Sequence, residues 1–92
     1  MFKIEISSRF KKSYKRVKGN IRFKEKIFEE VLGFLEKGAV LPQKYNDHGL
    51  KGDMVGHREC HLAPDILLVY KYERDVLVIV LVNIGTHSDL FD

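Results

Sequence analysis

Two apolar segments in the last third of the chain constrain its fold most. Ile66–Tyr72 and Val76–Asn83 are separated only by Glu73-Arg74-Asp75, and His57–Leu62 precedes them across the turn Ala63-Pro64-Asp65. Such short connections predict three consecutive strands in an antiparallel meander. The last two segments are apolar at successive positions, which is typical of strands covered on both faces of a sheet.

The first half of the chain is expected to cover this sheet. Phe2–Ile6 alternates and predicts a first strand, and Ser7 or Ser8 can cap a helix that ends at Gly19. A second helix is expected from Asn20 to about Lys37, whereas the turn-rich residues 39–56 predict an extended segment. The order β-α-α-β-β-β indicates an α+β fold with a two-helix hairpin on the sheet. At 92 residues the chain is expected to form one domain, residues 1–92.

Positive charge is concentrated at the beginning of the chain. Residues 1–26 hold ten Lys or Arg and two Glu, a net charge of +8, whereas the remaining residues hold six basic and eleven acidic groups, a net charge of −5. A basic block of this kind can be a solvated helix face, a phosphate-binding surface or a dock for an acidic protein.

All four histidines lie in the C-terminal half, at positions 48, 57, 61 and 87. Imidazole is the side chain that most readily exchanges protons near neutral pH. His48, His61, Asp65 and His87 all fall in or beside turns of the C-terminal half, so they can gather at one edge or face of the sheet. Proton-transfer groups beside a basic surface suggest that the chain acts on a polyanion, and RNA is the polyanion that we favour. A base for the ribose 2′-OH, an acid for the leaving 5′-oxygen and cations for the phosphorane would be sufficient without a metal or another cofactor.

Other site types find less support in the sequence. His57, Glu59 and His61 would share one strand face and could ligate zinc, but structural zinc sites favour cysteine pairs and Cys60 is alone. We therefore expect no metal site, and we expect Cys60 to be a small buried apolar residue. The phosphate-binding motifs GxxxxGK[ST] and GxGxxG do not occur.

The expected location is the cytoplasm. The longest apolar run, Val76–Val82, is far shorter than the roughly 20 residues of a membrane-spanning helix. No basic-then-apolar leader is visible, and a single cysteine fits a reducing compartment.

Four sequence stretches together carry a resemblance to a known family. They are Tyr45-Asn-Asp-His48-Gly-Leu-Lys-Gly52, Gly56-His-Arg-Glu-Cys-His61-Leu-Ala-Pro-Asp65, Leu67-Leu-Val-Tyr-Lys71 and Gly85-Thr-His-Ser-Asp-Leu-Phe91. In this combination the chain closely resembles the YafQ-type branch of the RelE/ParE toxin superfamily over essentially its whole length. The resemblance implies a helix hairpin on a curved, mainly antiparallel sheet.

It also implies an activity. Members are small bacterial toxins of type II toxin–antitoxin systems that enter the ribosomal A site and cut mRNA through its 2′-OH without a metal. Their expected partners are an antitoxin, the ribosome and mRNA, with operator DNA reached only through the antitoxin and no membrane involved. By resemblance His87 is the general acid, while Asp65, His61 and His48 share base, proton-relay and phosphate-contact roles. Phe91 is expected near the site.

Two departures from the family pattern bear on activity. Ile66 stands where a Trp that could stack on a base is common, and Asn83 stands where an Arg that could clamp the scissile phosphate is usual. The sequence therefore leaves three alternatives open. The chain can be a weakened toxin, or a protein that binds antitoxin or RNA without cutting. Alternatively, Arg58 or a nearby Lys can supply the positive charge that Asn83 lacks. Arg58 has the wrong strand parity relative to His61. The gyrase-poisoning branch of the superfamily is disfavoured because it lacks the acid–base cluster.

Overall fold

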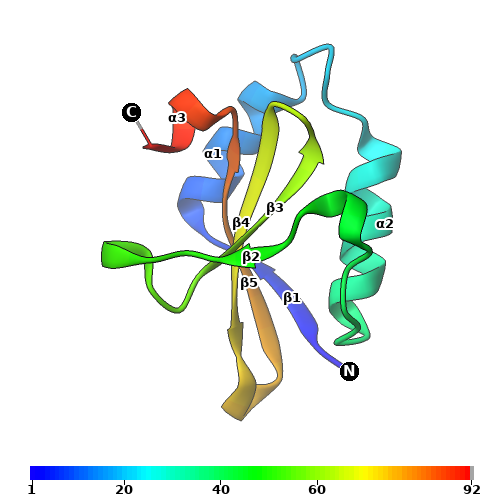
Figure 1. The fold of residues 1–92 in the computed structure, drawn as a ribbon, viewed down its shortest axis with the longest axis vertical. Coiled ribbons are helices and arrows are strands. Elements are labelled where there is room, and N and C mark those ends of the chain that lie inside the picture. The colour runs from blue at the N-terminus through cyan, green and yellow to red at the C-terminus, as the bar shows by residue number, and fades with distance from the viewer. Residues whose placement is uncertain (92) are drawn as a thin grey trace.

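The computed structural model describes residues 1–91, which form an α+β fold with one five-stranded sheet (Figure 1). The elements are β1 (Lys3–Ile6), α1 (Ser8–Val17), α2 (Glu25–Glu36), β2 (His48–Gly49), β3 (Arg58–Ala63), β4 (Ile66–Glu73), β5 (Val78–Gly85) and α3 (His87–Phe91). Short 3₁₀ turns lie at Gln43–Tyr45, Gly52–Met54 and Arg74–Val76. The strand order is β1-β5-β4-β3-β2, and only the β1–β5 pair is parallel. The predicted meander and fold class are thus confirmed.

One detail of the sequence expectation was wrong, and two short elements were not predicted. Helix α2 begins at Glu25, because the Asn20 side chain accepts a hydrogen bond from the Arg22 N–H and closes a turn instead of a helix cap. Two residues of the 39–56 segment, His48 and Gly49, pair with β3 as a short edge strand. A further helix, α3, follows β5 directly.

The main hydrophobic core lies between the sheet and the two longer helices. Ser7 caps α1 by accepting the Phe10 N–H, and its hydroxyl donates to the Val82 carbonyl, which ties the helix start to β5. The helices supply the buried residues Phe10, Val17, Phe28, Val31 and Leu35, which pack against one face of the strands. Figure 1 shows both helices over this side of the twisted sheet, so neither of them covers the opposite face. No helix within residues 1–91 is both long and apolar enough to cross a membrane.

Cys60 is fully buried on the core face of β3, as expected from the sequence. Burial, with smaller contributions from the charges of Asp47 and Glu59, raises the pKa of its thiol to about 12. Because the thiolate is the reactive form, the native protein should resist alkylation by iodoacetamide at pH 8 to 9 and react only after unfolding in urea. Mass spectrometry of time-quenched samples measures this. Labelling of the native protein as fast as in urea would contradict the burial of the thiol.

Candidate functional site

One face of the sheet carries side chains in register across four strands. His48 of β2 pairs with Glu59 of β3, Glu59 with Val69 of β4, and Val69 with Asn83 of β5. Directly paired residues project to the same face, so these four form one row. His61, Leu67 and Gly85 form the neighbouring row. We call this surface, opposite the main core, the site face.

Two histidines and a buried carboxylate meet at the β2–β3 end of the site face. Glu59 is only 6% exposed, and its Oε1 lies 3.3 Å from His48 Nε2 and 4.0 Å from His61 Nε2. His48 Nδ1 lies 2.8 Å from the Asn46 carbonyl oxygen, which can only accept, so Nδ1 carries a proton. His48 Nε2 therefore faces the carboxylate, at 3.3 Å from Glu59 Oε1. This cluster, His48–Glu59–His61, can accept a proton and pass it on.

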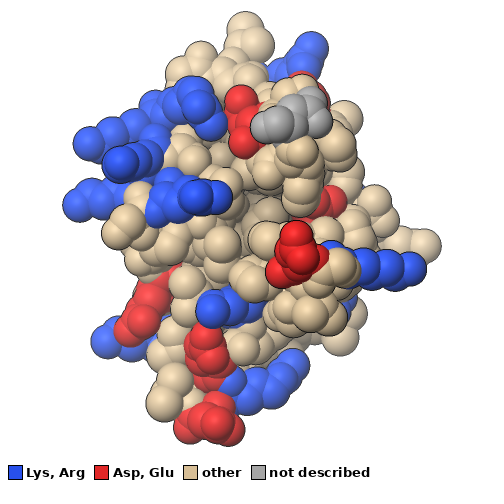
Figure 2. Space-filling view, turned by 90° about the vertical axis from the view of Figure 1, so that its left-hand side faces the viewer, with Lys and Arg blue, Asp and Glu red and all other residues tan. Residues whose placement is uncertain are grey.

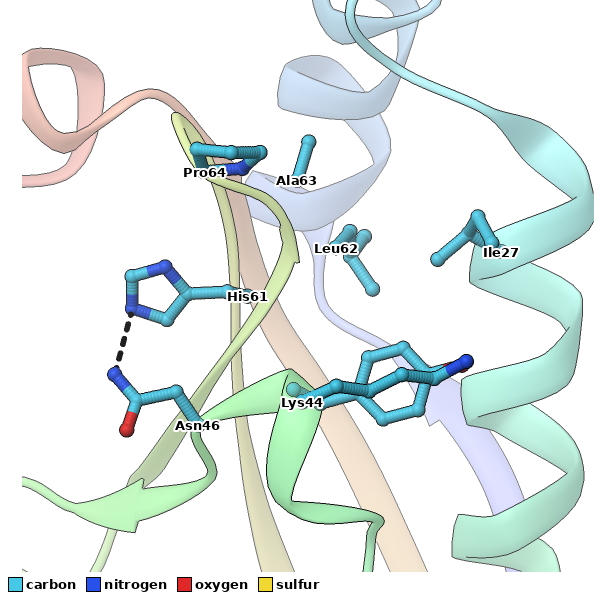
Figure 3. Close-up of a pocket in the computed structure, with 8 residues that line it drawn as sticks. Ile27, Lys44, Asn46, His61, Leu62, Ala63 and Pro64 are labelled. Atoms are coloured by element: carbon cyan, nitrogen blue, oxygen red, sulfur yellow. Dashed lines mark hydrogen bonds between the residues drawn. The ribbon is translucent and has the colours of Figure 1, made fainter.

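Asn46 connects this cluster to a neighbouring pocket (Figure 3). Its Nδ2 lies 3.5 Å from His61 Nε2, and its backbone adopts a left-handed conformation with φ of 49°. Asparagine tolerates this region better than most residues. The pocket has a volume of about 310 Å³, and Figure 3 shows the apolar side chains of Ile27 and Leu62 in its wall. His61 thus lies on the site face and also lines this pocket.

A polar network behind the sheet holds the segment that carries His48. Asp47 accepts hydrogen bonds from Arg58 Nε at 3.2 Å and Arg58 Nη2 at 2.9 Å, and also from the Tyr70 hydroxyl. Burial and the Asp47 carboxylate raise the pKa of Tyr70, so this hydroxyl remains a donor. Because Asp47 lies between Asn46 and His48, the network fixes the position of both.

His87 lies at the opposite end of the site face, at the start of α3. Thr86 and Asp89 cap this helix reciprocally, since Asp89 Oδ2 accepts the Thr86 N–H and Thr86 Oγ1 accepts the Asp89 N–H, both at 3.1 Å. The Thr86 N–H holds the pKa of Asp89 below its usual range. A Cβ at Gly85 would approach Asp89 Cβ to 3.0 Å, so glycine permits this tight turn. The exposed His87 ring packs on Phe91 with centroids 5.1 Å apart.

An apolar floor separates the two ends. Leu67 and Val69 of β4 are 3% and 1% exposed and lie between β3, which carries Glu59 and His61, and β5, which leads to His87. Two strand spacings give roughly 10 Å between β3 and β5. Because Leu67 and Val69 are themselves covered, a phosphodiester would lie above them, where it could meet proton-transfer groups on opposite sides.

Not all predicted site residues lie on the site face. Asp65 lies in the β3–β4 turn, where its carboxylate pairs with Arg22 Nη1 at 2.8 Å. Arg58 projects to the opposite face and is engaged by Asp47, in line with its strand parity. Ile66 is 0% exposed within the main core, so in this structure its side chain does not reach the surface where it was expected to contact substrate.

The zinc-ligand arrangement considered for the sequence does not form. His57 lies before β3, and its Nδ1 is 3.2 Å from the Met54 carbonyl oxygen. Within residues 1–91, no group of three or more His, Cys, Asp or Glu side chains is placed to hold a metal ion.

Two residues of interest were not singled out from the sequence as parts of an RNA-cutting site. Glu59 was considered only as a zinc ligand, although its shared strand parity with His61 already placed it on the same face. Arg9 of α1 borders two cavities that Asn83 also borders. The place of Arg9 in the first turn of its helix is the one feature of the sequence that marks it.

The basic side chains of α1 form a surface beside the site face. The exposed members are Arg9, Lys11, Lys12, Lys15 and Arg16. Figure 2 shows Lys and Arg side chains grouped on one side of this view, over α1. A polyanion approaching the site would meet this charge.

Comparisons with known proteins agree with one another. The family model described as "Bacterial toxin of type II toxin-antitoxin system, YafQ" matches residues 2–92. The Escherichia coli K12 mRNA interferase toxin YafQ is 31% identical over 88 residues, which cover 96% of this chain and 94% of the relative. The structure of a metal-bound toxin from Helicobacter pylori superposes with a TM-score of 0.90 at 43% identity, covering 99% of this chain and all of that one. YafQ in the E. coli DinJ-YafQ complex superposes with a TM-score of 0.86 at 28% identity, with full coverage of both chains.

Proposed function

Because the chain belongs to the YafQ family of bacterial toxins from type II toxin–antitoxin systems, we propose that it is a ribosome-dependent endoribonuclease that cuts mRNA in the A site. The observation that carries the proposal is the His48–Glu59–His61 cluster on the same sheet face as Asn83 of β5, the strand that leads to His87. The relative named in the E. coli complex is a toxin bound to DinJ, so we also propose a cognate antitoxin as partner.

The proposed reaction is a transfer within the RNA. The cluster removes the proton of the ribose 2′-OH, whose oxygen attacks the adjacent phosphorus. The bond from phosphorus to the 5′-oxygen breaks, and His87 donates a proton to that oxygen. The products are a 2′,3′-cyclic phosphate and a free 5′-OH. Placing base and acid on opposite sides of the phosphate suits in-line displacement. Asp65 is kept as a proposed contributor at the edge of the site, and Phe91 as a contact for the substrate.

Primer extension in a purified translation system tests the proposal. Wild-type protein should produce new mRNA ends within translated codons, and only when ribosomes are present. Cutting should persist with a chelator that removes transition metals but spares the magnesium that ribosomes need. Absence of cuts at any protein concentration would overturn the proposal.

A second candidate function is binding without cutting. It is favoured by the uncharged Asn83 on the site face, where a phosphate would gain from a cation. In that case the wild type would still form a tight complex with its antitoxin, while primer extension would show no cuts and expression without antitoxin would leave growth normal.

Glu59→Gln should lower the single-turnover cutting rate about 10-fold to 10²-fold, near the lower end of general-base effects because His48 and His61 remain. The substitution preserves side-chain shape but removes the charge that faces both rings. The matched control is Glu29→Gln, the same change at an exposed position of α2. Rates measured on stalled ribosome complexes at saturating protein give the comparison. Equal rates for the two variants would exclude Glu59 from the reaction.

A further inference from the structure

We propose that Arg9 supplies the positive charge that binds the scissile phosphate, acting from α1 beside Asn83. The inference deepens the proposed RNA cleavage and rests on it. It assigns a role in catalysis to a residue of the helix hairpin, whereas the other proposed catalytic groups lie on the strands, their turn and α3.

The cavities beside Asn83 place Arg9 at the site. A cavity of about 120 Å³ is bordered by Arg9 and Asn83 together with Val69 of the floor and Phe91 of α3. A second cavity, of about 400 Å³, is also bordered by Arg9 and Asn83, with Lys12 at its edge. Arg9 is thus the basic residue that reaches both the apolar floor and the helix carrying His87.

Arg9 also differs from the other arginines in having no partner within residues 1–91. Each of the others is engaged: Arg16 with Asp89, Arg22 with Asp65, Arg58 with Asp47, and Arg74 over the Tyr72 ring. Asp89, the acidic residue of the larger cavity, is held by Thr86 and Arg16. The Arg9 guanidinium is therefore available to an anion.

The position of Arg9 within its helix supports a functional role. It lies in the first turn of α1, which contains no acidic residue, and a cation there is disfavoured by the helix dipole. Residues that conflict with local preference tend to mark functional positions. The positive end of the helix and the guanidinium together would attract a phosphate.

Asn83 supplies a donor next to this charge. Its Oδ1 accepts the Ile84 N–H at 2.9 Å, which orients the amide and leaves Nδ2 to donate. An Arg9 guanidinium and an Asn83 amide could then both bind phosphate oxygens, with Arg9 stabilising the negative charge that grows in the phosphorane.

The test compares Arg9→Ala, Arg9→Lys, Asn83→Arg and the double variant Arg9→Ala/Asn83→Arg. Lys11→Ala is the matched control, because it removes one exposed charge from the same helix without bordering either cavity. Single-turnover rates at saturating protein separate the chemical step from ribosome binding, and thermal melts check the fold.

Arg9→Ala should lower the saturated rate about 10²-fold, the smaller end of the range for losing one transition-state donor. The saturated rate of Arg9→Lys should lie between those of the wild type and Arg9→Ala, since lysine keeps the charge but loses the bidentate geometry. Asn83→Arg should restore most of the rate in the Arg9→Ala background and add little to the wild type. Lys11→Ala should change only the concentration needed for saturation. No melting temperature should fall.

Different results would overturn different claims. A wild type that cuts, with Arg9→Ala and Lys11→Ala indistinguishable from it at saturation, would overturn the role of Arg9 and leave the proposed function intact. A wild type that does not cut beside an active Asn83→Arg variant would show that Arg9 cannot supply the charge. No cutting by either protein would overturn the proposed function together with this inference.

Discussion

Replacing His87 with alanine should reduce the cutting of mRNA by up to about 10⁴-fold, the upper end of what a general acid contributes. In the proposed reaction no other imidazole lies at the β5 end of the apolar floor, so the leaving 5′-oxygen would have to depart unprotonated. Stability should change by less than about 0.5 kcal/mol, because His87 is exposed and surface substitutions rarely cost more. Single-turnover cleavage and thermal melting measure the two quantities.

His57→Ala is the matched control for the loss of mRNA cutting in His87→Ala. His57 is also a histidine of the C-terminal half, but its ring contacts the Met54 carbonyl away from the His48–Glu59–His61 cluster. Its variant should cut at nearly the wild-type rate. A His87→Ala protein that retains cutting within 10-fold of wild type would remove His87 from the mechanism.

Replacing Asp47 with alanine should lower the free energy of unfolding by about 2–3 kcal/mol. Breaking a fully buried ion pair costs roughly 3–5 kcal/mol, but the Arg58 side chain is 39% exposed and can regain water. The Tyr70 hydroxyl, in contrast, would lose its acceptor, and because Tyr70 is only 1% exposed, water cannot readily replace it. For a domain of this size the melting temperature should fall by roughly 10–20 °C.

Two further variants separate the parts of this network. Tyr70→Phe removes one hydrogen bond and should lower the free energy of unfolding by about 1 kcal/mol. Asp47→Asn keeps the size of the side chain, so its loss of stability should lie between those of Tyr70→Phe and Asp47→Ala. Urea unfolding followed by circular dichroism gives the values. An Asp47→Ala protein as stable as Tyr70→Phe would show that the Arg58 contact contributes nothing.

Local patterns were sufficient to predict much of this fold. The apolar runs of β4 and β5 and the short turns around them indicated the meander, and the helical spacing of Phe10, Tyr14 and Val17 indicated α1. Elements that depend on distant partners were not predictable. The strand β2 has only two residues and exists because β3 pairs with it, and a capping preference alone placed the start of α2 five residues too early.

In the candidate site, too, the side-chain contacts that depend on residues distant in the sequence were not predictable. Strand parity correctly placed Cys60 in the core and Arg58 away from His61. It could not show that Asp47 engages Arg58 and Tyr70, which lie 11 and 23 positions further along the chain. Nor could it single out Arg9, because which member of a basic helix lacks a partner depends on acidic residues from other elements.

The parallel pairing of β1 with β5 also sets the order of events during biosynthesis. Lys3–Ile6 are translated well before Val78–Leu81, the residues with which they pair. A nascent chain therefore cannot close its sheet until residue 81 has left the exit tunnel, and the segment bearing His87 emerges later still. Contacts so distant in sequence also form slowly. The site face, which includes Asn83 of β5, is thus among the last parts of the described structure that can form as the chain is synthesised.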